Sequence, residues 1–578
     1  MSLRKTDNDE GSLAEDLLGK LHLDALNLLI VARLLGTFLW LFSLTMLLPI
    51  GVELLVGSNP VQLEKHPSAD PVFGFLASGV IGVVVGLALS WMGRLGRGEF
   101  YRREGILVVA LLWVVTGLVG GLPFWLSGGN LVGGYVDGVF EAISGLTTTG
   151  SSILGSGPNQ AIEEMPTAIL FWRSWLHWIG GIGIVVMFLI FLPVLGITEK
   201  ALFQCEVAGV SKEGLKPRIR ESARVLLLIY LSVTLALVLG FLYFGMGPFD
   251  AVCHSFATIA TGGFSTQNFS VGQYDSLGIE IVAIVGMVLA ATNFGLYYQV
   301  SRVFHPEHRS EDLDARQRKS LVRRKLGQAV AIFRNDPEYR FYFGTFVIVT
   351  LAVALILWIH GQVIPDQGEG RVHDYSNFFG ALRDSAFQTS SLISSTGFAN
   401  SDLLTWPLLA QCIMMAIMFG GGCGGSTGGG LKAIRMLVLF KILGRNLRRF
   451  LQPRSVEPLR INNSKLGEDV IDRVLALFVA WVLILALGSL ALIGLTKLDI
   501  VSAGTTMLTC VSNMGPGFTA MVPETGAFAN VYDANVSSYG SFGFLPDSAK
   551  LLMSFVMILG RLEVFTLLVI FIPSFWRD

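Results

Sequence analysis

The segment YVDGVFEAISGLTTTGSS at residues 135–152 has three counterparts later in the chain, and these four segments decide the fold. The counterparts are PFDAVCHSFATIATGGFS at 248–265, GALRDSAFQTSSLISSTGFAN at 380–400 and DIVSAGTTMLTCVSNMGPGF at 499–518. Each ends in small polar residues and a glycine, and the four glycines in shared register are Gly150, Gly263, Gly397 and Gly515. Such divergent repetition indicates four related structural units.

The residue thirteen positions before each glycine has a side chain that suits a helix N-cap. These residues are Asp137, Asp250, Asp384 and Ser502. About ten residues follow before the polar stretch, which predicts a helix about 15 Å long, or half a bilayer. We therefore expect four half-helices, each capped by one of these residues and followed by an extended strand with the glycine.

The remaining sequence is typical of an integral membrane protein. The chain has 578 residues, of which 52% are hydrophobic and 15% charged, and its mean hydropathy is +0.61; soluble domains carry about 25% charged residues. Ten apolar stretches are long enough to span a bilayer. They lie near 26–55, 72–92, 105–127, 168–195, 223–246, 277–300, 341–360, 406–440, 471–495 and 549–574. The half-helices fall between the members of the last four pairs.

Lysine and arginine are concentrated in alternate loops. Basic residues follow the second span and fill the loops 196–224, 301–340 and 441–473, whereas 57–71, 127–166 and 362–376 carry few. Because cytoplasmic loops are enriched in these residues, we expect both termini in the cytoplasm and the half-helices toward the outside. The membrane rule already explains the basic loops, so we expect a lipid bilayer and no nucleic acid as partner.

The order span, half-helix, glycine strand, span is that of a pore-loop unit. Irregular backbone at membrane depth is tolerated only where it is buried or lines a water-filled path. Glycine permits the backbone angles that turn successive carbonyls inward. The alternative, four ordinary outer loops rich in glycine and threonine, leaves the shared register unexplained. The sequence thus predicts one pore with four strands around its axis.

The residues beside the glycines indicate which ion the pore takes. The candidate ion ligands are Thr148, Thr149, Gly150, Thr261, Gly262, Gly263, Ser395, Thr396, Gly397, Asn513, Met514 and Gly515. None is acidic or basic, so carbonyl and hydroxyl oxygens are the expected ligands, as in potassium filters; calcium or magnesium would favour carboxylates. Potassium is then the transported ion, and no tightly bound cofactor is expected, since the cysteines and histidines show no metal-ligand spacing.

The filter segments TTTGSS, ATGGFS, STGFAN and SNMGPGF resemble, in this order, those of the Trk/Ktr/HKT superfamily of potassium transporters. The two extra N-terminal spans and the closing stretch ILGRLEVFTLLVIFIPSFWR are most similar to bacterial Trk membrane subunits of the TrkH/TrkG type. The resemblance implies an all-α membrane fold with pseudo-fourfold symmetry and potassium uptake across the bacterial inner membrane. In plant relatives, serine at the first filter glycine accompanies sodium transport, so Gly150 favours potassium.

The resemblance also implies an organisation and partners. The expected parts are a cytoplasmic segment 1–25, two N-terminal helices in 26–103, and repeats at 104–200, 201–310, 311–455 and 456–578. A homodimer is expected. The chain shows no nucleotide-binding domain of its own, and the resemblance implies a separate cytosolic TrkA-type subunit responsive to NAD or ATP. That subunit would dock on the basic loops.

The third repeat contains a second glycine cluster, FGGGCGGSTGGGLKAIR at 419–435. Its candidate gate residues are Gly420, Gly421, Gly422, Gly424, Gly425, Ser426, Thr427, Gly428, Gly429 and Gly430. Each helical glycine costs about 1 kcal/mol relative to alanine, so the span should break here. A phosphate loop is disfavoured because the motif GxxxxGK[ST] is absent, while close helix packing through small residues stays open. The resemblance implies an intramembrane gating loop below the filter.

Arg561 is the second gate candidate, in VMILGRLEVFTLL of the last span. A charge at this depth costs at least about 2.5–3.5 kcal/mol, so Arg561 should face the bundle interior. The resemblance implies a place beside the permeation path, as a brake on cations. An ion pair with Glu563 is the alternative, disfavoured because residues i and i+2 do not share a helix face.

Two functional classes are alternatives to a passive potassium channel. A potassium/proton or potassium/sodium symporter would normally need an intramembrane carboxylate or histidine relay, and Glu141 and His254 in the half-helices are among the few candidates. A membrane enzyme would need a convergent catalytic set, which the sequence lacks.

Three polar loops are enlarged, at 301–335, 362–376 and 522–547. They are either solvated loops, or they form the pore entrance or a docking surface for a partner.

Overall fold

The computed structural model describes most of the chain. The described residues are 26–58, 64–95, 102–155, 161–191, 215–304, 315–364, 371–453, 458–461, 464–519 and 535–577. The expected N-terminal segment 1–25 lies outside them. So do parts of the basic and enlarged loops, namely residues 196–214, 305–314, 365–370 and 520–534.

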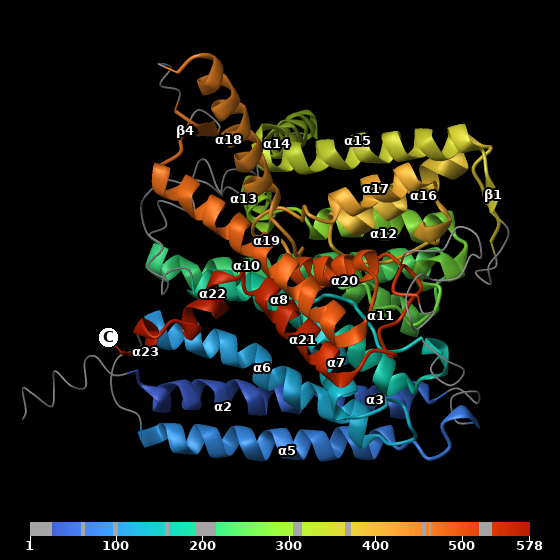
Figure 1. Cartoon of the computed structure of the whole chain (residues 1–578), viewed down its shortest axis with the longest axis vertical. Coiled ribbons are helices and arrows are strands. Elements are labelled where there is room, and N and C mark those ends of the chain that lie inside the picture. Colours follow the sequence, from blue (N-terminus) through green and yellow to red (C-terminus); the bar gives the residue numbers. More distant parts are fainter. Residues whose placement is uncertain are drawn as a thin grey trace, which may run out of the picture.

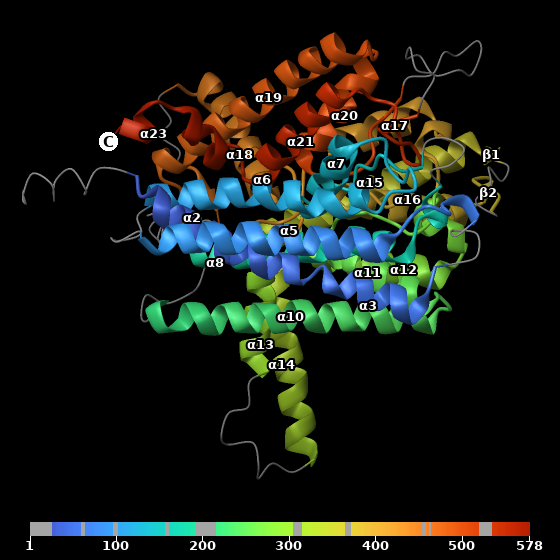
Figure 2. The ribbon, with the colours of Figure 1, turned by 90° about the horizontal axis from the view of Figure 1, so that it is seen from below.

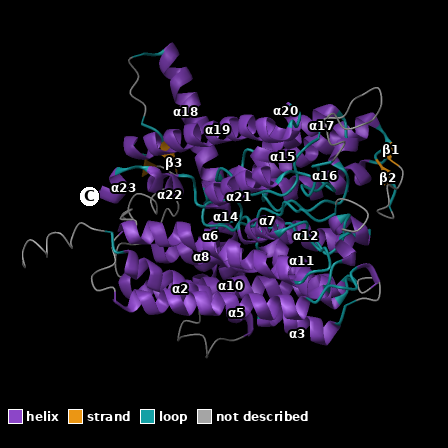
Figure 3. Ribbon diagram, turned by 60° about the horizontal axis from the view of Figure 1, so that its bottom comes forward, coloured by secondary structure: helices purple, strands orange, loops and turns teal. Residues whose placement is uncertain are grey.

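Long helices lie side by side in one bundle and run along a common direction (Figure 1). Within the described residues, six helices are long and apolar enough to cross a membrane, and eight if two sharply bent pairs each count as one span. The other two expected spans correspond to α8 (Thr167–Phe191) and to the pair α17 (Leu408–Ile417) and α18 (Ala433–Leu451). In the part of the chain that the structure describes, the strands form two short hairpins, coloured orange in Figure 3.

The N-terminal helices form one side of the bundle, drawn in blue in Figures 1 and 2. They are α2 (Leu28–Leu44), its continuation α3 (Leu47–Val56), α5 (Pro71–Met92) and the short turn η1 (Gly93–Leu95). A Cβ on Gly36 of α2 would lie 2.5 Å from the carbonyl oxygen of Gly86 in α5. Glycine therefore allows the two backbones to touch, as small residues do in membrane bundles.

Each of the four repeats contains a first span, a short pore helix and a second span. The first repeat has α6 (Arg102–Leu126), α7 (Tyr135–Leu146), η2 (Ile162–Glu164) and α8. The second has α10 (Leu215–Tyr243), α11 (Pro248–Ile259), η3 (Ser270–Tyr274), α12 (Leu277–Ala290) and α13 (Phe294–Phe304). This order agrees with the expected fold class.

The third and fourth repeats follow the same plan. The third has α14 (Ala315–Asn335), α15 (Pro337–His360), the hairpin β1 (Val363–Ile364) and β2 (His373–Asp374), α16 (Phe378–Ile393), η4 (Leu403–Thr405), α17 and α18. The fourth has the hairpin β3 (Arg460–Ile461) and β4 (Ser464–Lys465), α19 (Glu468–Thr496), α20 (Ile500–Ser512), α21 (Asp547–Arg561), α22 (Phe565–Leu568), η5 (Val569–Phe571) and α23 (Ser574–Arg577). Helix α14 projects from the bundle in Figure 2.

The predicted N-caps of the pore helices were wrong. The observed caps are Gly134, Gly247, Asn377 and Asp499. Asp137, Asp250 and Ser502 instead occupy the third position of their helices, and Asp384 lies in the interior of α16. The reason is that acidic side chains also suit the first turn, where they reach back to free amides: Asp137 accepts from the backbone amide of Gly133 at 2.9 Å.

Two second spans that the sequence predicts as continuous are sharply bent. The angle is 93° between α12 and α13 and 111° between α21 and the segment Phe565–Phe571. At the first bend the carbonyl of Ala291 accepts from the amide of Cys423, a residue of the glycine-rich segment. At the second, Glu563 and Val564 have φ of 54° and 61°. These left-handed conformations are incompatible with helix.

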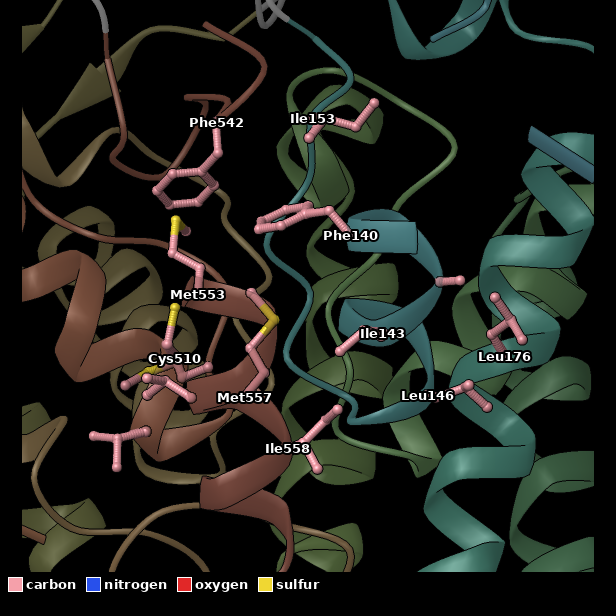
Figure 4. Packing of buried hydrophobic residues seen from close by; sticks show 14 of the residues in the cluster. Phe140, Ile143, Leu146, Ile153, Leu176, Cys510, Phe542, Met553, Met557 and Ile558 are labelled. Carbon is pink, nitrogen blue, oxygen red and sulfur yellow. The ribbon is translucent and has the colours of Figure 1, made fainter. Parts of the chain in front are cut away.

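The largest apolar core joins neighbouring repeats. Figure 4 shows Phe140, Ile143 and Leu146 of α7, with Leu176 of α8 on one side and Met557 and Ile558 of α21 on the other. All six side chains are at least 95% buried. The pore helix α7 is thus fixed by side chains of the first and fourth repeats, which hold its C-terminal end in place.

Candidate ion pathway

The first three of the aligned glycines follow one another at contact distance. A Cβ built on Gly150 would lie 2.0 Å from the carbonyl oxygen of Gly262. One built on Gly263 would lie 2.0 Å from the carbonyl oxygen of Thr396. Any side chain here would collide with the neighbouring strand, so the close approach of the three strands requires glycine.

The fourth glycine closes a ring. A Cβ on Gly397 would lie 2.8 Å from the amide nitrogen of Gly515, and one on Gly515 would lie 3.1 Å from the carbonyl oxygen of Gly150. The hydroxyl of Ser151 also donates to the Gly515 carbonyl at 3.0 Å, although these residues are 364 positions apart. The structure therefore brings together the four positions that the sequence repeat aligned.

The four strands share an unusual backbone conformation. Positive φ occurs two residues before each aligned glycine, at Thr148 (51°), Thr261 (53°), Ser395 (59°) and Asn513 (50°). It recurs at the glycine itself in three strands, at Gly150 (79°), Gly263 (84°) and Gly397 (85°). Residues other than glycine rarely adopt such angles, and they concentrate at functional sites. The shared strain indicates that one backbone geometry is held in all four repeats.

Each pore helix ends toward the ring in the same way. The amide of the residue before the glycine donates five residues back, from Thr149 to Ser144, Gly262 to Ala257, Thr396 to Ser391 and Met514 to Thr509, at 2.8–2.9 Å. Four helix C-termini with their partial negative charge thus surround one place. The seven candidate ligands other than glycine are buried, each with at most 1% of the residue exposed.

Cavities lie on both sides of the ring. On one side a cavity of about 280 Å³ is lined by Gly150, Gly263, Gly397 and Gly515 together. On the other side lies a cavity of about 20 Å³, lined in part by Asn513, Gly429 and Arg561. The larger volume would hold several waters, whereas the smaller would hold about one. A larger cavity thus adjoins the four glycines, and a small one lies next to the glycine loop and Arg561.

The second glycine cluster interrupts its span. Helix α17 ends at Ile417 and α18 begins at Ala433, and we call the residues between them, 418–432, the glycine loop. The base of the loop is closed by backbone pairing, because the Gly421 amide donates to the Leu431 carbonyl at 2.9 Å. The prediction that this span breaks at its glycines is confirmed.

The tip of the glycine loop contacts other repeats. The hydroxyl of Thr427 donates to the carbonyls of Ile259 and Ala290 in the second repeat, at 3.0 Å each. The amide of Gly429 donates to the hydroxyl of Ser395, next to the ring, at 2.5 Å. These bonds hold the loop against the C-terminal ends of the second and third pore helices, with Ser426 and Thr427 fully buried.

Arg561 faces the bundle interior, as expected, and its contacts are to backbone oxygens. Its guanidinium donates to the carbonyl of Thr427 at 2.9 Å and to that of Gly180 at 3.1 Å. The alternative ion pair is not present, because Glu563 bonds to Arg435 of α18 at 2.5 Å. Arg561 therefore joins the glycine loop to the first and fourth repeats.

A comparison with protein-family models matches residues 73–577 to the model described as TrkH, cation transport protein. The chain belongs to the TrkH family of cation transport proteins. Two curated Trk system potassium uptake proteins of Escherichia coli strain K12 are similar to it. TrkH is 34% identical over 550 residues and TrkG 29% over 551, each covering 95% of this chain and 99% of the relative.

The fold of this TrkH-family chain is also that of a solved structure. The crystal structure of the potassium transporter TrkH from Vibrio parahaemolyticus superimposes with a TM-score of 0.76 at 32% sequence identity. The match covers 96% of this chain and 100% of the other. The arrangement of four repeats and two additional helices is therefore a property of the TrkH family.

Sequence reasoning missed the ion pair behind the first strand of this TrkH-family chain. The Arg173 guanidinium of α8 bonds to the Glu141 carboxylate of α7 at 2.7 Å, and both are at least 99% buried. Glu141 also accepts from the Ile153 amide at 3.0 Å, and Arg173 donates to the Ser265 carbonyl at 3.0 Å. The pair anchors the strands of repeats one and two, and charges inside predicted apolar segments were the available signal.

A second network lies behind the third strand. Asp384 of α16 accepts from Arg371 and from the Asn400 side chain, at 2.7 Å and 3.0 Å. Arg371 also pairs with Glu280 of α12 at 3.1 Å. The described part of loop 362–376 thus packs on the pore helix through buried charges. It is not simply a solvated loop.

Proposed function

We propose that this chain is the potassium-conducting membrane subunit of a Trk-type uptake system, with the ring of four glycines as its selectivity filter. The observation that carries this proposal is the cavity lined by all four glycines, one from each repeat. Relatives at 34% identity over almost their whole length are named as potassium uptake proteins. A carbonyl-lined ring is the chemistry by which proteins replace the hydration shell of potassium.

The ligands in this proposal are oxygen atoms of the twelve residues around the ring. Within the described residues, no group of three or more His, Cys, Asp or Glu side chains is placed to hold a metal ion, so carbonyls and hydroxyls are the available donors. The Thr148 hydroxyl is buried without a hydrogen-bond partner. Four helix C-termini add a negative potential that favours a cation. The filter is thus suited to a monovalent ion that is bound and released rapidly.

The proposed gate consists of the glycine loop and Arg561. The loop bonds to the third strand through Gly429 and Ser395, and a cavity of only about 20 Å³ is lined by the loop and α21. Arg561 places a buried positive charge at the same level and bonds to the loop through Thr427. A cation leaving the filter would meet both the loop and this charge, which together slow its passage. Displacement of the loop would open the path.

The proposed setting is the inner membrane of a bacterium, with the wide cavity toward the outside and both termini in the cytoplasm. Basic side chains support this orientation. Exposed residues of this kind lie in the segments that join the repeats, among them Arg323 and Arg324 of α14 and Arg448 and Arg449 of α18. We propose a second copy of the chain as homodimer partner, and a cytosolic TrkA-type nucleotide-binding subunit that docks on the basic loops. Co-purification with such a subunit, and a change of flux on adding it, would test that assignment.

The function is tested by rubidium flux into liposomes that contain the purified chain. A passive pore predicts that flux follows an imposed membrane voltage and is unchanged when proton or sodium gradients are reversed. A symporter predicts uphill potassium movement driven by one of those gradients. Two results would contradict the proposed function. One is equal flux of all small cations, without preference for potassium. The other is no flux at all, whether or not the cytosolic subunit is present.

A further inference from the structure

Helix α15 begins with a buried carboxylate that bonds to the glycine loop and to the start of α18. One oxygen of Glu338 accepts from the amide of Gly424 at 2.6 Å and from the amide of Ile434 at 3.0 Å. The Glu338 side chain is buried, with 2% of the residue exposed. A single atom, Oε1 of Glu338, therefore holds Gly424 and Ile434 close together and closes the segment between them into a loop.

The bond to Ile434 replaces a missing cap. Helix α18 begins at Ala433, and its N-cap residue Lys432 makes no side-chain cap bond. The first amides of a helix need an acceptor, and a carboxylate near a helix N-terminus also gains from the helix dipole. Glu338 of α15 supplies both the acceptor and the negative charge. The start of α18 therefore depends on the position of α15.

Apolar contacts reinforce the same connection. Tyr342, one turn further along α15, lies in one apolar cluster with Cys423 of the loop, Ala433 at the start of α18 and Ala291 of the second repeat. All four residues are at least 97% buried. The first turns of α15 thus hold the loop base by one charged side chain and one aromatic ring.

We propose that Glu338 is a latch that keeps the glycine loop beneath the filter, and that loss of its two hydrogen bonds releases the loop. Glu338 acts as a positioning residue, since it bonds to the loop and not to the ring. It lies three residues beyond Asn335, the last residue of the projecting helix α14. A displacement of α14 would therefore shift Glu338 and strain its two hydrogen bonds. The proposal rests on the gate assigned above, but the latch can be tested without any flux measurement.

The test uses the buried thiol of Cys423, the neighbour of Gly424, as a reporter of loop release. The variant Glu338→Ala is labelled with N-ethylmaleimide in liposomes, and each cysteine peptide is quantified by mass spectrometry. We expect the labelling rate of Cys423 to rise at least about tenfold, because one hydrogen bond to a charged group is worth such a factor. The buried Cys253 and Cys510 should remain protected.

Glu104 offers a matched control. It lies in the first turn of α6, is 3% exposed, and accepts from the amide of Asn27 at 3.1 Å. It is therefore a buried carboxylate at the start of another first span, without contact to the glycine loop. Glu104→Ala should leave Cys423 protected. If it exposes Cys423 as strongly as Glu338→Ala does, the latch is wrong.

The remaining outcomes separate the latch from the gate. Increased Cys423 labelling with increased rubidium flux supports both, whereas increased labelling with unchanged flux supports the latch and contradicts the gate. Unchanged Cys423 labelling overturns the latch whatever the flux. If Glu338→Ala increases the labelling of Cys423, Cys253 and Cys510 alike, the same labelling is measured in the milder variant Glu338→Gln. A selective rise at Cys423 supports the latch, and a uniform rise in this variant too shows that Glu338 only stabilises the fold.

Discussion

Arg561 of the last repeat donates a 2.9 Å hydrogen bond to the carbonyl of Thr427, at the tip of the glycine loop of the third repeat. The two residues are 134 positions apart. The same guanidinium reaches the carbonyl of Gly180 in the first repeat. One side chain thus connects three repeats just behind the ring, and its charge and its bond to the loop can be tested separately.

Replacing Arg561 by alanine should increase rubidium flux roughly tenfold. A unit charge about 10 Å from the ion at an effective dielectric constant of about 20 contributes about 1.7 kcal/mol to the barrier, and each 1.4 kcal/mol is a factor of ten. Arg561→Lys retains the charge and should conduct much more slowly than Arg561→Ala. Equal flux in wild type and both variants would contradict the electrostatic brake.

Shortening the glycine loop between Gly420 and Gly430 should also raise flux, because the segment beneath the ring would no longer reach the carbonyls of the second repeat. The measurement is rubidium uptake into liposomes, with the elution profile and melting temperature confirming that the variant is folded. A well-folded shortened chain with unchanged or lower flux would show that the loop is not an obstruction.

Gly150→Ser should reduce the preference for potassium over sodium. Any Cβ at this position would lie 2.0 Å from the carbonyl oxygen of Gly262, so the first strand must move and the ring must change its spacing. The permeability ratio follows from reversal potentials under bi-ionic conditions. Gly155 is a matched control, since it also has positive φ (91°) but its Cβ would meet nothing closer than 3.8 Å. A ratio unchanged in Gly150→Ser, or changed equally in Gly155→Ser, would exclude Gly150 from the filter.

Glu141→Ala should destabilise the protein by about 3–5 kcal/mol, because it leaves the buried Arg173 charge without its partner. Thermal unfolding in detergent measures this loss. Glu141→Gln keeps an acceptor for the amide of Ile153, so it should lose less stability than Glu141→Ala. In the double variant with Arg173→Met, part of the stability should return, since no unpaired charge remains. Wild-type melting of Glu141→Ala would show that the ion pair does not hold the first strand.

The repeat was predictable from sequence because its glycines are required by geometry. Gly150 and Gly263 contact neighbouring backbone so closely that no other residue fits, and this constraint leaves a readable register. The start of each pore helix was not predictable in the same way. Asp137 and Asp384 share a position relative to the glycine, yet the first lies in the opening turn and the second in the helix interior. The same residue type satisfies both environments.

The bends and the latch could not be predicted from local sequence. The α12 helix stops where the Ala291 carbonyl accepts from Cys423 of another repeat, so its end is decided by tertiary contacts. The bend falls at Glu563 and Val564, which are neither glycine nor proline. Glu338 resembles any acidic residue in a first helical turn, and its role depends on an amide 86 positions away. Local patterns predict spans and strands but not such long-range bonds.

The central claim is that the four glycine strands bind the transported ion on their common axis. The most direct measurement is anomalous diffraction from crystals grown with thallium in place of potassium. We predict ordered thallium enclosed by Gly150, Gly263, Gly397 and Gly515, displaced by excess potassium and weakened by sodium only at much higher concentration. Thallium bound elsewhere with none within the ring, or a ring site that sodium displaces as readily as potassium does, would contradict the account.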